Sequence, residues 1–228
     1  MKKLVLALAF VSALFTSSCS SDDSNSSPSL GETTGNYWPM EVNNTWTFSS
    51  NSGSSELRMI GVTTINGTPY YELSDDADNV FGVQNWVAKK GATYFQKIAD
   101  TNINQDGVSI NMQGYEIPLF KDHLEANSSW NGTVTSRVNY SVNGQNSSTT
   151  ATIKYTSTIT EKNSTVVLNG ATYPNVIKVK TKVEIKILNQ TTPIDLEYWL
   201  AKDVGPIREY TSSNGSIQER TLINYMLY

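Results

Sequence analysis

Apolar and polar side chains alternate with a period of two along most of this chain, which is typical of half-buried β-strands. The longest example covers residues 176–188, where one face is apolar and the other is rich in lysine. The apolar face carries Ile177, Val179, Thr181, Val183, Ile185 and Ile187, and the polar face carries Lys178, Lys180, Lys182, Glu184 and Lys186. We expect the first face to pack on a core and the second to meet water.

Alternation, or enrichment in β-branched and aromatic residues, predicts further strands along the chain. They are expected at residues 46–49, 56–62, 70–73, 80–88, 93–98, 108–112, 115–120, 134–142, 151–159, 196–201, 207–211 and 216–227. Pairs that favour tight turns recur between them, namely Asn66-Gly67, Asp106-Gly107, Asn143-Gly144, Asn169-Gly170 and Asn214-Gly215. Residues 121–127 are the one candidate for a short helix. The prediction is an all-β fold, an antiparallel curled sheet or half-open barrel with at most one short helix.

A short pattern occurs twice in the same order. Residues 65–70 resemble residues 168–173 around an Asn-Gly pair, and the Trp-x-Ala-Lys sequence at Trp86 resembles the one at Trp199. This similarity suggests an internal duplication, with halves of about 37–125 and 126–228. Chance similarity between short β-segments is the alternative.

The N-terminus has the features of a targeting segment. Two lysines, Lys2 and Lys3, precede an apolar run from Leu4 to Phe15, which is shorter than the ~20 residues needed to span a membrane as a helix. Residues 1–18 are therefore expected to be a signal peptide. A polar stretch rich in serine and aspartate follows, so residues 19–36 are expected to be a flexible tether and residues 37–228 a single domain.

Cys19 is the only cysteine in the 228 residues and cannot form a disulfide within the chain. The residues before it, Leu14-Phe15-Thr16-Ser17-Ser18, resemble a lipobox, although the usual leucine position holds Thr16. Loose boxes of this kind are similar to those of Bacteroidota lipoproteins. The resemblance implies acylation of Cys19 and anchoring in the outer membrane. An ordinary secretory peptide with an incidental cysteine is the alternative to a lipoprotein. Asp22 and Asp23 resemble an acidic tag for surface display, although tethers rich in serine and aspartate are also common.

Composition argues against several functions. Without Lys2 and Lys3 the chain has 15 basic and 21 acidic residues, and it shows no basic cluster. Nucleic-acid binding is not expected, because Lys and Arg contacts to phosphate supply most of that affinity. The expected partner is a membrane, reached through the N-terminal lipid, and the protein is expected to be a monomer.

Motifs for catalysis or cofactor binding are weak. The single histidine, His123, lies in a polar stretch without a nucleophile motif, so no enzymatic activity and no cofactor are expected. Asn102, Asn104 and Asp106 alternate in the manner of a calcium loop. However, Gln113 stands where the bidentate acid should be, so we expect a hairpin there and no metal site.

Aromatic residues are the remaining candidates for ligand binding. Trp38, Trp86, Trp130 and Trp199 could stack on sugars or line an apolar pocket, although each is more readily explained as a core residue.

Two motifs resemble a pattern in uncharacterised bacterial lipoproteins. One is Tyr37-Trp38-Pro39 with Asn44-Thr45-Trp46, and the other is Trp199-Leu200-Ala201 with Val204-Gly205. Asn43 occupies a position that usually holds glycine. The resemblance implies a half-barrel similar to carriers of lipids and lipoproteins, but it brings no established activity. We therefore expect an envelope lipoprotein that binds a lipid or another apolar ligand. A structural lipoprotein with a closed aromatic core and a glycan-binding surface protein are the alternatives.

Overall fold

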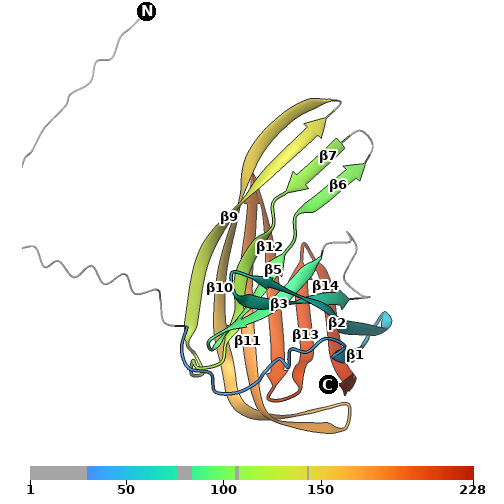
Figure 1. The fold of residues 1–228 in the computed structure, drawn as a ribbon, viewed down its shortest axis with the longest axis vertical. Coiled ribbons are helices and arrows are strands. Elements are labelled where there is room, and N and C mark those ends of the chain that lie inside the picture. Colours follow the sequence, from blue (N-terminus) through green and yellow to red (C-terminus); the bar gives the residue numbers. More distant parts are fainter. Residues whose placement is uncertain (1–29, 76–83, 106–107, 143) are drawn as a thin grey trace, which may run out of the picture.

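One antiparallel sheet accounts for most of the chain that the computed structural model describes, which is residues 30–75, 84–105, 108–142 and 144–228 (Figure 1). Its strands are β1 (Thr45–Ser50), β2 (Gly53–Ile65), β3 (Thr68–Asp75), β4 (Asn85–Lys90), β5 (Thr93–Ile98), β6 (Thr101–Gln105), β7 (Val108–Met112), β8 (Tyr115–Lys121), β9 (Ser129–Val142), β10 (Gln145–Leu168), β11 (Ala171–Ile187), β12 (Gln190–Ala201), β13 (Gly205–Ser213) and β14 (Ser216–Met226). Their order across the sheet is β6-β7-β9-β10-β11-β12-β13-β14-β1-β2-β3-β4-β5-β8. The predicted fold class is confirmed, and the sheet is not closed into a barrel.

Most neighbouring strands are also neighbours in sequence, but three pairings are not. β1 pairs with β14, so the first and last strands along the chain are neighbours in the middle of the sheet. β7 pairs with β9, and β5 pairs with β8. Within the described residues, β6 and β8 are therefore the edge strands of the sheet.

Each predicted strand matches an observed one, but several observed strands are longer. β10, for example, continues to Leu168, beyond the predicted end at residue 159. There are three other differences. The sequence pattern predicts a hairpin turn at the asparagines of β6, and the structure shows a strand there. β4 begins at Asn85, and residues 80–83 of the predicted strand lie outside the described part of the chain. The short helix considered at residues 121–127 is wrong, since this segment ends β8 and then forms turns.

The sheet is bent where its longest strands lose their regular register. β10 and β11 carry three irregularities between Ile159 and Val166, and bulges of this kind bend a strand and increase its twist. The end of the β10–β11 hairpin consequently curls beneath the sheet (orange in Figure 1). Val166 and Tyr173 from this hairpin are buried there. We call this closed end the lower end of the molecule.

The lower core fills this end and contains 22 buried apolar residues. Trp38 and Trp46 meet edge to face with ring centres 6.4 Å apart, and Tyr94 stacks on Phe120 at 4.0 Å. The full set is Tyr37, Trp38, Trp46, Phe48, Leu57, Met59, Leu73, Val87, Tyr94, Leu119, Phe120, Trp130, Ile159, Val166, Tyr173, Val176, Ile177, Val179, Leu200, Ala201, Ile207 and Leu222.

The N-terminal strap, which we define as residues 30–44, crosses the lower end before β1 begins (Figure 1). It is fastened to Asp122, whose side chain is fully buried. The Asp122 carboxylate accepts hydrogen bonds from the Thr33 hydroxyl at 2.6 Å and from the Thr34 amide at 2.9 Å. The Lys89 ammonium lies 3.5 Å from the same carboxylate. These contacts hold the strap against the ends of β4 and β8.

The strap also contributes to the lower core. The Tyr37 amide donates a hydrogen bond to the Tyr94 hydroxyl at 3.0 Å, and Tyr37 and Trp38 are among the buried residues. The strap therefore covers apolar surface that the sheet by itself would leave open at this end.

Candidate functional site

A second apolar cluster, which we call the upper apolar wall, lies on the strands that rise away from the lower core. Only four of its residues are buried, namely Val138, Ala151, Ile153 and Val183. Nine more are only partly buried, namely Ile110, Met112, Tyr115, Val134, Tyr155, Ile185, Ile187, Ile194 and Leu196. The lower core also has nine partly buried residues, but it has 22 buried ones. A much larger share of the residues of the upper apolar wall is therefore only partly buried.

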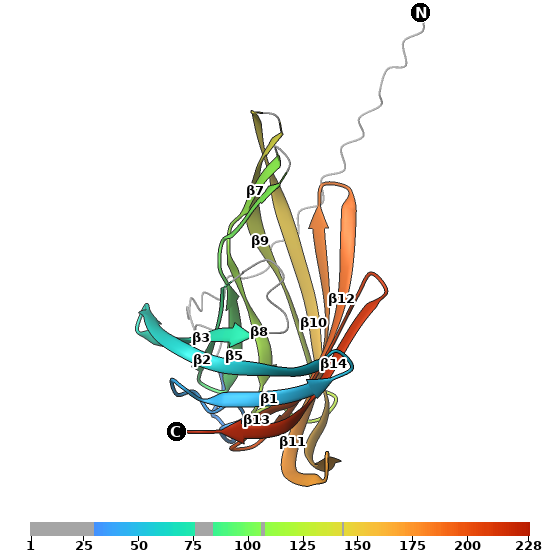
Figure 2. The same ribbon diagram turned by 90° about the vertical axis from the view of Figure 1, so that its right-hand side faces the viewer.

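The upper apolar wall faces the same side of the sheet as the lower core. Side chains two residues apart point to the same face of a strand. Val134 lies four residues after the core residue Trp130 on β9, so the two side chains share a face. Tyr155 on β10 packs against both clusters and marks the boundary between them. Figure 2 shows β7 and β9 diverging from β12 toward the top of the molecule, so the two sides of the sheet spread above the core.

Strand register brings the residues of this wall together. Tyr155 on β10 lies opposite Val183 on β11, and Val183 lies opposite Ile194 on β12. Ile153 and Ile185 form the neighbouring pair. Residues from three consecutive strands therefore form one apolar surface.

The two tyrosines of the upper apolar wall lie in surroundings of low polarity. Burial raises the pKa of the Tyr115 hydroxyl above its ordinary value of 10.0, and it does the same for Tyr155. Both side chains are therefore neutral at physiological pH, and the surface can accommodate an apolar group without placing it beside a tyrosinate.

The four tryptophans selected from the sequence do not form one site. Trp38 and Trp130 belong to the lower core. Trp86 alternates with the buried Val87 on β4 and points to the opposite face of the sheet. Trp199 lies between two cations, with the Lys178 ammonium 4.1 Å and the Arg208 guanidinium 4.6 Å from its ring centre. Ligand binding by any of the four stays a prediction.

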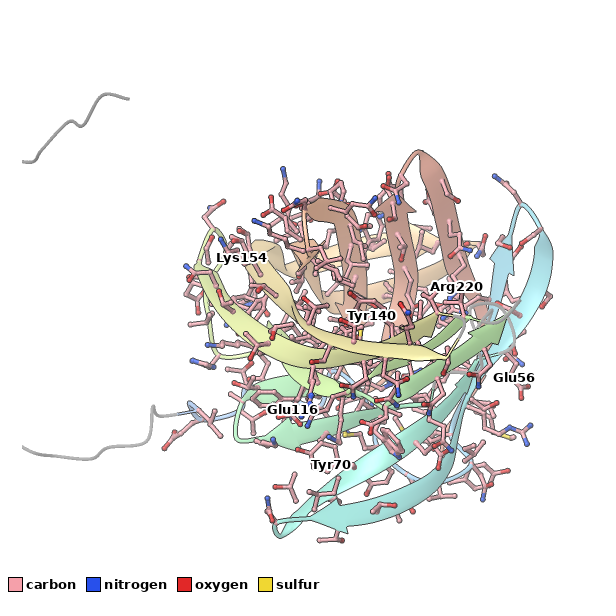
Figure 3. The ribbon with its side chains drawn as sticks, turned by 90° about the horizontal axis from the view of Figure 1, so that it is seen from above. Glu56, Tyr70, Glu116, Tyr140, Lys154 and Arg220 are labelled. Carbon is pink, nitrogen blue, oxygen red and sulfur yellow. The ribbon has the colours of Figure 1, made fainter. Side chains whose placement is uncertain are left out.

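Trp199 belongs to a charged ladder across β11, β12, β13 and β14. Its indole N–H donates to Glu197 at 2.6 Å, and Arg208 pairs with Glu197 at 3.0 Å and with Glu219 at 2.8 Å. A second polar cluster links Tyr70 to Glu116 at 2.5 Å and Lys90 to Glu116 at 2.7 Å, with Tyr70 and Glu116 visible in Figure 3. Cross-strand contacts of this type stabilise a sheet, so we assign both clusters a structural role.

The two motifs that resemble lipoprotein patterns meet in space. The Trp46 indole N–H donates to the Val204 carbonyl at 2.7 Å, and a side chain at Gly205 would overlap the Trp46 ring. Gly205 also has a φ of 108°, which favours glycine. Asn43, at the position usually held by glycine, has a φ of 78°, which asparagine tolerates better than most residues. The motifs are thus explained by packing of the closed end.

The residues considered for catalysis and metal binding are scattered. His123 lies in the turn after β8, and its ring packs against Gly31. Asn102 and Asn104 lie on β6, where Asn102 accepts a hydrogen bond from Asn111 at 2.6 Å. Asp106 lies outside the described residues. Over the described part of the chain, no three His, Cys, Asp or Glu side chains gather as a metal site would require.

The anchor proposed for Cys19, and the tether up to residue 29, lie outside the described residues. Among the residues that are described, none form a helix with the length and apolar character needed to cross a membrane.

Comparison with known proteins identifies a similar fold. No protein-family model matches the sequence, and no curated protein matches it. A crystal structure of a presumed lipoprotein from Parabacteroides distasonis has a TM-score of 0.50 at 11% identity, covering 86% of this chain and 100% of that one. A presumed exported protein with a YmcC-like fold from Bacteroides fragilis has a TM-score of 0.39 at 12% identity, covering 83% of this chain and 98% of that one. At these identities the likeness to the first protein establishes the fold alone.

Proposed function

We propose that this protein is a non-catalytic lipoprotein of the bacterial cell envelope that binds an apolar chain on its upper apolar wall. The observation that carries the proposal is the difference in burial between the two clusters. Nine residues of the wall are only partly buried although they face the inside of the curved sheet. Ligand sites in proteins are concave and mostly apolar, and such a surface gains free energy when a ligand covers it.

The location rests on the N-terminal sequence and on the fold. The signal-like segment, the lone Cys19 and the polar tether favour acylation and export. A presumed lipoprotein with a similar fold supports that location. Labelling with an alkyne fatty acid tests it, because the wild-type protein should incorporate label and Cys19→Ser should not. Protease treatment of whole cells tests surface display, and a protein that stays intact would argue for the periplasmic face.

Binding is tested directly with a dansyl-labelled fatty acid and the full chain carrying Cys19→Ser, so that no acyl chain of its own competes. We expect Ile194→Gln or Leu196→Gln to weaken binding about tenfold, since each places an amide against the chain. Val167→Gln is the matched control, because Val167 is 66% exposed at the β10–β11 hairpin and outside the wall. Equal binding by all variants, or no binding by the wild type, would refute the proposal.

The natural ligand can be identified by native mass spectrometry of the lipoprotein extracted from its own membrane. We expect additional mass beyond the covalently attached acyl chains. A mass that corresponds to the acylated protein alone, together with no binding of the fatty-acid probe, would favour a structural lipoprotein.

A further inference from the structure

The inner face of the sheet changes in chemistry between β12 and β13. Leu196 belongs to the upper apolar wall, yet its cross-strand neighbour on β13 is Thr211, and the next residue along the row is Gln218 on β14. In the row below, Tyr198 lies opposite Glu209, which lies opposite Arg220. The apolar wall is therefore directly continuous with a polar surface.

The centre of the polar surface is a buried ion pair. Arg220 is only 7% exposed, and its guanidinium donates to one Glu209 oxygen at 2.9 Å from Nε and at 2.6 Å from Nη2. Nη1 lies 3.4 Å from the Ser55 hydroxyl, and the guanidinium covers the Phe48 ring at 4.6 Å. Figure 3 shows Arg220 inside the curve of the sheet, whereas Glu56 lies outside it.

A contribution to stability does not by itself explain a buried ion pair. Removing two charges from water costs several kcal/mol per ion, and an apolar pair of the same size is often as stable. The pair does fix the polar groups of Arg220, Glu209 and Ser55 in place. A few polar groups at fixed positions beside an apolar surface orient a bound ligand.

A cavity of about 290 Å³ opens over this ion pair. Apart from Arg220 and Glu209, it is lined chiefly by uncharged polar side chains, including Ser50, Ser55, Thr211 and Gln218. Hydroxyl and amide groups donate and accept hydrogen bonds, which matches the hydroxyl groups of a sugar or glycerol. An anionic group is a poorer match, since Glu209 offsets Arg220 and Glu219 is also in the lining.

We infer that this cavity binds the uncharged, hydroxyl-rich head group of an amphiphile whose chain lies on the upper apolar wall. The inference rests on the proposed function, because it assigns the head group of the same ligand. A sugar or glycerol head group would have the same chemistry, and a free glycan is an alternative source of hydroxyl groups that the experiment separates.

The test uses isothermal titration of the full chain with Cys19→Ser and three probes. They are dodecyl glucoside kept below its critical micelle concentration, dodecanol kept below its solubility limit, and methyl glucoside. We expect dodecyl glucoside to bind about tenfold more tightly than dodecanol, and methyl glucoside to bind far more weakly than either. Thr211→Val and Gln218→Leu should each reduce dodecyl glucoside binding several-fold without changing dodecanol binding. Thr156→Val, on the exposed outer face of β10, should change neither.

The outcomes distinguish this inference from the proposed function. Equal binding of dodecyl glucoside and dodecanol would overturn the inference and leave chain binding intact. Binding of methyl glucoside as tight as that of dodecyl glucoside would also overturn it, since the cavity would then be a glycan site. If neither dodecyl probe binds, the proposed function itself fails.

Discussion

The lower and upper ends of the molecule are built from the same kind of strand but are covered very differently. At the lower end, the N-terminal strap and the bent β10–β11 hairpin close over the aromatic side chains of the lower core. At the upper end, the same strands continue with the same inward-facing alternation, yet nine of the apolar residues stay partly exposed. Strands alone therefore do not complete a core, and the segments that cross the end of the sheet decide which part is closed.

This difference suggests a division of labour. The lower core supplies stability, because burial of apolar surface is the main favourable contribution to folding. The upper apolar wall contributes less to stability and leaves a surface that a ligand can cover.

Truncating the lower core should have the largest effect. Trp46 is fully buried, and its indole N–H is bonded to the Val204 carbonyl. We expect Trp46→Ala to lower the free energy of unfolding by about 3–5 kcal/mol, because it leaves a large cavity and an unpaired carbonyl. Urea denaturation followed by circular dichroism measures the change. A loss below about 1 kcal/mol would contradict the assignment of Trp46 to a closed core.

Releasing the strap should have the next largest effect. Asp122→Ala removes the acceptor for Thr33 and Thr34 and leaves Lys89 without its buried carboxylate, so we expect a loss of about 2–4 kcal/mol. Hydrogen exchange should accelerate at the Tyr37 amide and stay unchanged in the upper strands. Asp195→Ala, at an exposed position on β12, is the control and should cost less than about 0.5 kcal/mol.

Alkaline pH should also act on the lower core. Burial raises the pKa of Tyr94, and of Tyr37 to a lesser degree, above the ordinary 10.0, so the folded state keeps both neutral while the unfolded chain ionises. The contribution of these two tyrosines to the free energy of unfolding is fully present below pH 10.0 and is lost as the pH rises above it. Burial lowers the pKa of Lys89, and this lysine opposes the loss of stability at pH values below 10.5. We expect the effect of the two tyrosines to be the larger one.

The measurement for this prediction is tyrosinate absorbance recorded together with circular dichroism. The most alkaline part of the tyrosinate signal should develop together with unfolding. Complete ionisation of all tyrosines while the sheet remains folded would show that the lower core is open to water.

The smallest effect is expected on the upper apolar wall, and β12 offers a matched comparison. Leu196 is partly buried in the wall, whereas Leu200 on the same strand is fully buried in the lower core. Leu200→Ala should cost about 2–5 kcal/mol and Leu196→Ala only about 1 kcal/mol, since a partly exposed side chain loses less contact. Equal losses in urea denaturation would remove the distinction between the two regions.

Much of the fold follows from local sequence. The alternation at residues 176–187 correctly assigns the inward face of β11, with Val179 and Val183 buried and Lys180 and Lys182 exposed. Asn66-Gly67 and Asn169-Gly170 both form hairpin turns with positive φ at each residue. The local sequence does not predict β6, because its asparagines by themselves favour turns. Pairing with β7 overrides that preference.

The candidate site was less accessible to sequence reasoning. Its residues lie in ordinary strand patterns, and alternation tells which side chains face inward without telling which of them are covered. Large aromatic side chains often bind ligands, which makes four tryptophans candidates in the sequence, but two of these four belong to the lower core.

The sequence by itself determined the strands, the turns and the inward face of each strand, because these depend on local backbone preferences and on a period of two. Only the tertiary structure decided that β1 meets β14 and that the strap is fastened at Asp122, so that one end is closed while the other stays open. These features depend on contacts between residues far apart in the chain, which local patterns do not specify. The position of Arg220 and Glu209 beside the upper apolar wall has the same origin, since it follows from the register of β12, β13 and β14.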